Sequence, residues 1–156
     1  MSFYKTNEIK MNNIRFTLFF LAIFGADHFY AQTCLSPDGH ISISFSLSSD
    51  GQPQYEMKLG ETKVIHTSRL GLELKNDTDL MSDFAIEDFQ YDRFDNTWTP
   101  VWGEESQIRN HYNEMFISLK QSTTSRTMNI RFRVYNEGMG FRYEFPQQPN
   151  LGHFIV

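Results

Sequence analysis

The residues whose types suit chemistry gather between Trp98 and Glu114, in the stretch WTPVWGEESQIRNHYNE. This stretch holds two tryptophans, one arginine, one histidine and three glutamates. Paired carboxylates can cleave a glycosidic bond by acid and base chemistry, and an indole ring can stack on a sugar. Glutamates this close in sequence are usually solvated, so Glu104, Glu105 and Glu114 are predicted to face water, and none is assigned a catalytic role.

The chain lacks the sequence patterns of other kinds of reactive site. There is no Ser/His/Asp ordering of a hydrolase, no glycine-rich loop that could cradle phosphate and no zinc-ligand spacing. His111 and Glu114 are three residues apart, but a lone pair of ligands does not hold a metal ion. We therefore assign no metal ligand and no catalytic residue.

The local sequence predicts that the stretch from Trp98 onward is a loop. Pro100 and Gly103 interrupt strand pairing, so the segment is expected to bulge out between two strands. A long loop rich in aromatic, amide and charged groups is typical of a surface that binds a partner. Alternatively, Trp98 and Trp102 fill the core or an interface, which is the commoner role of a tryptophan between strands.

The segments around this loop alternate between apolar and polar residues, as strands with one buried face do. Alternation predicts strands at residues 40–47, 54–59, 62–67, 69–74, 127–135 and 140–145. Asp50 and Gly51 favour a hairpin turn, and the polar run 75–83 is predicted to be a loop. No segment has the pattern of a helix of ten or more residues. The predicted fold class is therefore all-β, an antiparallel β-sandwich.

Charged side chains are expected on the outer faces of the last two predicted strands. Arg131 and Arg133 alternate with apolar residues on one strand, and Arg142 and Glu144 do so on the next. Cross-strand ion pairs on a wet face are the common arrangement, and a row of ligand-binding side chains is the alternative.

Composition limits the classes of function. A chain of 156 residues with 40% apolar content is long enough for one domain with a core, but hardly for two. The formal net charge is −5, whereas nucleic-acid-binding proteins concentrate lysine and arginine to neutralise phosphates. We therefore expect no nucleic-acid partner.

The N-terminus predicts export. Basic residues precede the apolar run FTLFFLAIFGA, and Ala31 is a small residue suited to cleavage by a signal peptidase. Residues 1–31 are therefore predicted to be a signal peptide, with Met11 as an alternative start of translation. The mature chain would begin at Gln32 and be periplasmic or secreted. The apolar run is shorter than the ~20 residues of a spanning helix, so no membrane association is expected after cleavage; the alternative is an uncleaved anchor.

Five motifs together resemble a known family: SPDG, LGLEL, WTPVWGEESQIRNHYNE, IRFRVYNEGMGFRYEFPQQ and NLGHFIV. Through these motifs, in this order, the segment from Ser36 to Val156 is similar to the N-terminal domain of glycoside hydrolase family 97. The resemblance implies that residues 32–156 are part of that domain. Its β-sandwich would be a portion of a larger β-super-sandwich.

Members of that family are secreted or periplasmic α-glucosidases, with some α-galactosidases. The resemblance implies that a central (β/α)₈ barrel supplies the catalytic carboxylates, and that a calcium ion lies near the sugar in the full-length enzyme. This chain resembles a front piece that stops before the barrel. We therefore predict no cofactor in this chain, no glycoside hydrolysis by it alone, and contact with α-linked glycans only through the full enzyme.

In such an enzyme, the stretch around Trp102 would lie between the sandwich and the barrel. Trp102 is the candidate apolar anchor, while Arg109, Asn110 and His111 are candidates for hydrogen bonds to the barrel or on the substrate side. Alternatively, Trp102 and Tyr112 simply fill the core. Two other functions stay open: a free-standing carbohydrate-binding or interaction β-domain without activity, and an exported adhesion or structural module.

Overall fold

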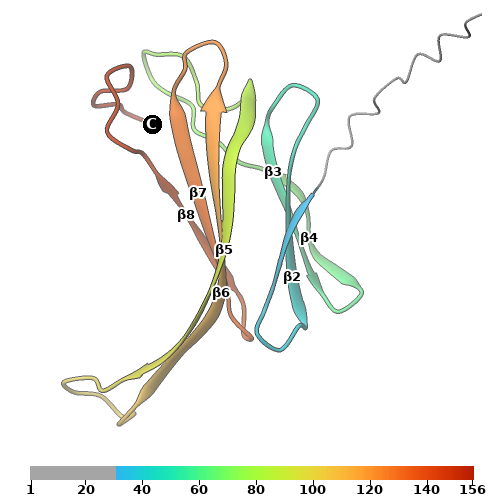
Figure 1. Cartoon of the computed structure of the whole chain (residues 1–156), viewed down its shortest axis with the longest axis vertical. Helices are drawn as coiled ribbons and strands as arrows, with labels where there is room; N and C mark the ends of the chain where they lie inside the picture. The colour runs from blue at the N-terminus through green and yellow to red at the C-terminus, as the bar shows by residue number, and fades with distance from the viewer. Residues whose placement is uncertain (1–30) are drawn as a thin grey trace, which may run out of the picture.

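Two antiparallel sheets of four strands each make up residues 31–156, the part of the chain that the computed structural model describes (Figure 1). The first sheet has the order β1 (Gln32–Leu35), β2 (Ile41–Leu47), β3 (Pro53–Leu59) and β4 (Thr62–Arg69). The second has the order β5 (Phe84–Trp98), β6 (Ile108–Gln121), β7 (Thr127–Val134) and β8 (Met139–Glu144). The predicted all-β antiparallel sandwich is confirmed. The predicted signal peptide lies, except for Ala31, outside the described residues.

The core lies between the sheets, where the predicted inward faces meet. Ile41, Ile43 and Phe45 of β2 are buried, and so is every second residue of β7. The ring of Phe132 in β7 lies 6.3 Å from that of Phe45 and 6.0 Å from that of Tyr55 in β3. Alternation predicted these faces correctly because successive side chains of a strand point to opposite sides of its sheet.

Residues 69–74 do not form the strand that their leucine spacing predicted. Beyond the end of β4, the run makes only one isolated bridge, between Leu72 and Leu80. Gly71 has a φ of 134°, and a Cβ atom there would lie 2.5 Å from the carbonyl oxygen of Leu80. Its N–H donates to the hydroxyl of Tyr143 at 2.9 Å. The chain turns at this glycine because only a residue without a side chain fits there.

Each sheet ends in two edge strands. These are β1 and β4 in the first sheet and β5 and β8 in the second, so each of the four has one side without a strand neighbour in the described part of the chain. β4 is largely exposed and carries Val64 on the surface of the first sheet. Within residues 31–156, no helix is long and apolar enough to cross a membrane.

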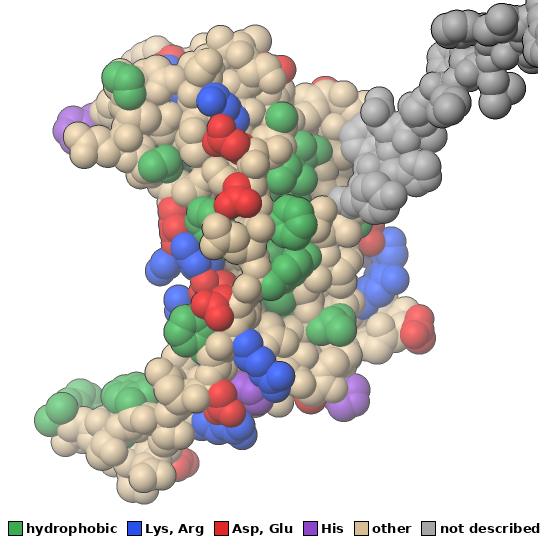
Figure 2. Space-filling view, viewed as in Figure 1, with side chains coloured by type: hydrophobic (Ala, Val, Ile, Leu, Met, Phe, Trp, Pro, Cys, Tyr) green, Lys and Arg blue, Asp and Glu red, His purple; other side chains and the backbone are tan. Residues whose placement is uncertain are grey.

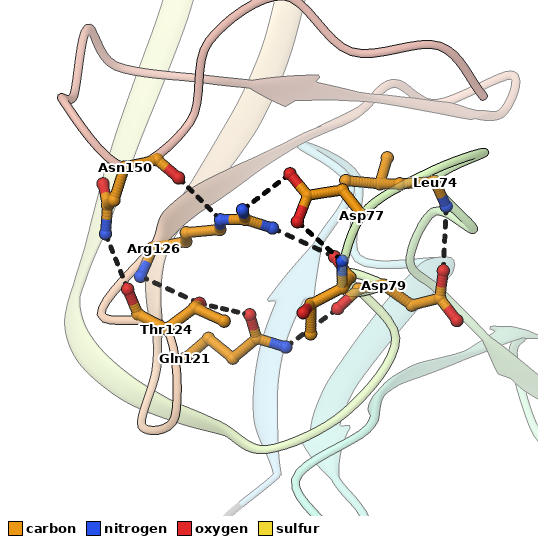
Figure 3. Close-up of polar contacts among 8 residues, drawn as sticks. Leu74, Asp77, Asp79, Gln121, Thr124, Arg126 and Asn150 are labelled. Carbon is orange, nitrogen blue, oxygen red and sulfur yellow. Dashed lines mark hydrogen bonds and ion pairs between the residues drawn. The ribbon is translucent and has the colours of Figure 1, made fainter.

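Arg126, just before β7, holds two loops together at one end of the sandwich (Figure 3). Its guanidinium donates to Oδ2 of Asp77 at 2.7 Å, to the carbonyl of Thr78 at 3.0 Å and to the carbonyl of Asn150 at 2.8 Å. Residues 75–83 lie between β4 and β5 and contain only an isolated bridge at Leu80, so the predicted loop is confirmed. Partly buried hydrogen bonds from a charged group therefore help to hold this loop, together with the buried side chain of Leu80.

β5 and β6 extend beyond the rest of their sheet. Residues 94–98 of β5 pair with residues 108–112 of β6, whereas the pairing of β6 with β7 begins only at Asn113. The result is a two-stranded ribbon closed by the loop 99–107. We call this ribbon and its loop the arm (residues 94–112); it projects from the sandwich at the lower left of Figure 1. The predicted loop is confirmed for 99–107, but the residues after it belong to β6 because their backbone pairs with β5.

Candidate functional site

The tip of the arm exposes large apolar side chains. Val101 is 99% exposed and Trp102 is 88% exposed, while Trp98 at the end of β5 is about half exposed. Figure 2 shows hydrophobic side chains gathered at the end of the arm. The interpretation of the two tryptophans as core residues is therefore wrong for this chain. A two-stranded ribbon is only marginally stable in water, so an apolar tip on it is a surface suited to a partner.

One face of the arm is aromatic and continues onto the outer face of the second sheet. Phe94 stacks on Tyr112 with ring centroids 5.0 Å apart, and Tyr112 packs against Tyr135 at 5.1 Å. Trp98 shares this face because it follows Phe94 by four residues in the same strand. Tyr112 is buried, as one interpretation of the sequence expected, but it packs on the outer face rather than between the sheets.

The opposite face of the arm is polar. Arg109 donates from Nε and Nη2 to the two oxygens of Asp95, both at 2.7 Å, and these bonds lower the pKa of Asp95. Nε2 of His111 lies 3.9 Å from the same carboxylate and makes no hydrogen bond within the described residues. Asn110 lies on the aromatic face by strand alternation. The four predicted site residues thus lie in three places. Arg109 binds Asp95 with His111 beside it, Asn110 lies on the opposite face, and Trp102 is at the tip.

A network of charged side chains covers the outer face of β6, β7 and β8. Glu114 is only 5% exposed; it accepts hydrogen bonds from Arg131 and, at 2.8 Å, from Nε of Arg133. Glu144 accepts from Nε of Arg131 at 2.7 Å and from Nε of Arg142 at 2.8 Å. The predicted cross-strand ion pairs are therefore confirmed. The prediction that Glu114 faces water is wrong, because two guanidinium groups cover its carboxylate.

The outer face of the second sheet is concave. In Figure 2 the outline is hollowed between the arm and the opposite end of the sandwich, and basic and acidic side chains gather in the hollow. A pocket of about 190 Å³ opens on this face, lined by Arg131, Arg133, Tyr135, Gly140, Phe141 and Arg142. Sequence reasoning placed the arginines on this face but missed the pocket. The residue that could have indicated the pocket is Gly140. It pairs with Arg133 across the strands and leaves space where a side chain would stand.

The carboxylates of the described residues do not form a calcium site. In this part of the chain, no group of three or more His, Cys, Asp or Glu side chains is placed to hold a metal ion. Asp95 and Glu114 already bind arginines, and His111 lies on the opposite face of β6 from Glu114. These residues therefore do not fit the calcium ion that the family resemblance implies for the full-length enzyme.

Known families and solved structures match most of the chain. The family described as "Glycosyl-hydrolase 97 N-terminal" matches residues 34–156. A glycoside hydrolase family 97 enzyme from Pseudoalteromonas sp. strain K8, in complex with panose, is 30% identical with a TM-score of 0.74. That match covers 79% of this chain and 19% of the enzyme, and a family 97 enzyme from the same strain in complex with acarbose matches with the same values.

A more distant match shows the fold alone. The crystal structure of a β-arabinopyranosidase matches with a TM-score of 0.69 at 19% identity, over 76% of this chain and 18% of that one. This chain therefore spans about a fifth of the length of the enzymes that it matches.

Proposed function

The chain belongs to the N-terminal domain family of glycoside hydrolase family 97, and on that premise we propose that it is the non-catalytic β-sandwich of a secreted or periplasmic α-glycosidase. Its role is to pack on the catalytic (β/α)₈ barrel and to shape the mouth of the sugar site. The reacting carboxylates and the calcium ion then belong to the other four fifths of such an enzyme, which the match to this chain does not cover.

The exposed arm carries this proposal. Val101 and Trp102 stand almost fully in water at the end of a ribbon that has no third strand to support it. Burial of apolar surface contributes roughly 25 cal/mol per Å², and tryptophan is enriched among the residues that dominate binding energy at interfaces. Covering this tip with a second domain would bury the side chains and brace the ribbon.

The substrate class follows from the relatives. Panose and acarbose are the ligands in two matching family 97 structures from Pseudoalteromonas sp. strain K8. Both compounds are built from α-linked units. These ligands favour α-glucosides as substrates of the full enzyme, with α-galactosides as the alternative.

On the arm, Asn110 is available on the aromatic face, whereas Arg109 is held by Asp95. Asn110 is therefore the better placed of these two for a hydrogen bond to a domain that covers the aromatic face.

Co-expression with the rest of a family 97 enzyme tests this proposal. The partner is the Pseudoalteromonas enzyme without the residues that match this chain, and we expect the two pieces to co-purify. Trp102→Ala is expected to weaken the complex by at least roughly tenfold, because it removes the most exposed aromatic anchor. The measurement is the dissociation constant of the purified pair.

The matched control is Val64→Ala, which removes an exposed apolar side chain from β4 on the other sheet and should leave the complex unchanged. This chain without its partner should not hydrolyse p-nitrophenyl α-glucoside or α-galactoside, with or without calcium. Turnover by a repurified sample would contradict the non-catalytic role. Failure to co-purify, together with binding on a glycan array, would favour the free-standing carbohydrate-binding domain.

Export is tested separately by sequencing the N-terminus of the secreted protein. If residues 1–31 are a signal peptide, the mature chain begins at Gln32. Exported protein that retains Met1 or Met11 would contradict cleavage and favour a membrane anchor.

A further inference from the structure

We propose that the pocket between β7 and β8 binds a carboxylate, and that this carboxylate is an acidic side chain of the catalytic part of the same enzyme. The pocket lies around Arg133, Gly140 and Arg142 on the concave outer face of the second sheet. The inference rests on the proposed function, because it names the chemistry by which that part of the enzyme is recognised.

Hydrogen-bond donors in the pocket remain available. Arg133 uses Nε to bind Glu114, while its two terminal nitrogens bind no acceptor within the described residues. Arg142 uses Nε and Nη2 to bind Glu144, which leaves its Nη1 without an acceptor there. Two arginines that line one pocket therefore retain three terminal nitrogens with no acceptor among the described residues, and a planar carboxylate is the acceptor that guanidinium groups match best.

Arg133 is held in place before any ligand arrives. Glu114 fixes the Nε of Arg133, and the guanidinium of Arg133 lies over the ring of Tyr112, 4.6 Å from its centroid. Arg131 beside it is fully engaged by Glu114 and Glu144. Because these contacts restrict the side chains, binding an anion would lose little conformational entropy.

The charge of the pocket favours an anion. The three arginines of the network carry three positive charges, and the two glutamates that they bind carry two negative charges. Within this network of five side chains, one positive charge is therefore left in excess, although the chain as a whole is acidic at −5. A carboxylate in the pocket would pair with this excess positive charge.

Gly140 supplies the space. It stands opposite Arg133 in the β7–β8 register, and a Cβ atom added to it would meet no atom within 4 Å. Any side chain at this position would reach into the pocket of about 190 Å³, which is large enough for a carboxylate. The glycine is not required by backbone strain, since Gly140 does not have a positive φ.

The position of the pocket indicates that the carboxylate comes from a protein. The guanidinium of Arg133 lies over Tyr112, and Tyr112 stacks on Phe94 of the arm. The pocket is thus continuous with the aromatic face of the arm, in the hollow that Figure 2 shows. A convex domain that covers the aromatic face would also cover the pocket and could place an acidic side chain in it.

Two substitutions test the pocket in the complex with the rest of the family 97 enzyme. Gly140→Leu fills the pocket without removing a charge, and Arg142→Gln removes an exposed donor. We expect each to weaken the complex by at least roughly tenfold. Arg69→Gln, which removes an exposed arginine from β4 on the other sheet, is the matched control and should have no effect.

A titration of this chain alone with sodium acetate measures the chemistry of the pocket directly. The Nε–H resonances of Arg133 and Arg142 should shift and saturate with acetate but not with sodium chloride at the same ionic strength. Gly140→Leu should abolish the shift while leaving the resonances of Arg69 unchanged. Equal responses to acetate and chloride would overturn the proposed carboxylate pocket.

The outcomes separate this inference from the proposed function. If Trp102→Ala weakens the complex while Gly140→Leu and Arg142→Gln do not, the docking role stands and the pocket proposal fails. If acetate binds but neither pocket variant changes the complex, the site serves a free anion and the proposed protein source is wrong. If no pieces co-purify, the proposed function fails, and the proposed source of the carboxylate fails with it.

Discussion

Replacing Phe132 with alanine is expected to lower the free energy of unfolding by about 3–5 kcal/mol. Phe132 is fully buried and packs its ring against Phe45 and Tyr55 of the first sheet and against Phe141 of β8. The alanine variant loses these contacts and leaves a cavity that the surrounding sheets cannot close completely. Because total stability is typically about 5–15 kcal/mol, this single change should remove a large share of it.

Urea denaturation followed by far-ultraviolet circular dichroism measures this loss. Tryptophan fluorescence is unsuitable, because both tryptophans lie at the exposed end of the arm. Phe141→Ala is the matched control: Phe141 belongs to the same aromatic cluster but is 39% exposed on an edge strand, so about 1 kcal/mol is expected. Equal losses for the two variants would show that the core is not centred between β2, β3 and β7.

Replacing Glu114 with glutamine is expected to destabilise the chain by about 3 kcal/mol. The carboxylate of Glu114 is buried and lies between the guanidinium groups of Arg131 and Arg133. The amide keeps the size of the side chain but removes its charge, so two neighbouring cations lose their shared partner. The urea midpoint of the variant should fall clearly below that of the wild-type chain at neutral pH.

Glu144→Gln is the control for this change. Hydrogen bonds from Arg131, and then from Arg142, lower the pKa of Glu144 against the opposing effect of burial. Because the folded pKa lies below the unfolded one, the stability from Glu144 is complete above about pH 4.3 and is lost as the pH falls through the folded value. The control should thus lose less stability than Glu114→Gln, and its difference from wild type should vanish in acid. An effect of Glu144→Gln larger than that of Glu114→Gln would contradict the central place of Glu114.

The concave outer face of the second sheet combines the exposed apolar tip of the arm with a pocket lined by arginines. The tip of the arm offers apolar area, and the pocket around Arg133 offers directed donors. Together they supply the apolar anchor and the charged contact that specific interfaces combine. This combination is why we place the partner on the outer face of the second sheet rather than on the largely exposed β4.

The sequence alone determined the fold class, the inward faces and the family. Strand alternation has a period of two, so the buried positions of β2 and β7 can be listed without knowing which strands are neighbours. The family likeness was equally accessible because its motifs are contiguous in the chain, and the match over residues 34–156 confirms it. Both inferences depend only on residues that are close together in the sequence.

Only the tertiary structure decided which distant residues meet. The burial of Glu114 depends on the register that places β6 beside β7, and the pocket depends on Gly140 standing opposite Arg133. The turn at Gly71 depends on the close approach of Leu80. The arm also required the structure, since its length is set by where β7 stops pairing with β6, at Asn113. These features come from contacts between separate strands, and hydrophobic alternation does not specify the register between strands or the point where a neighbouring strand ends.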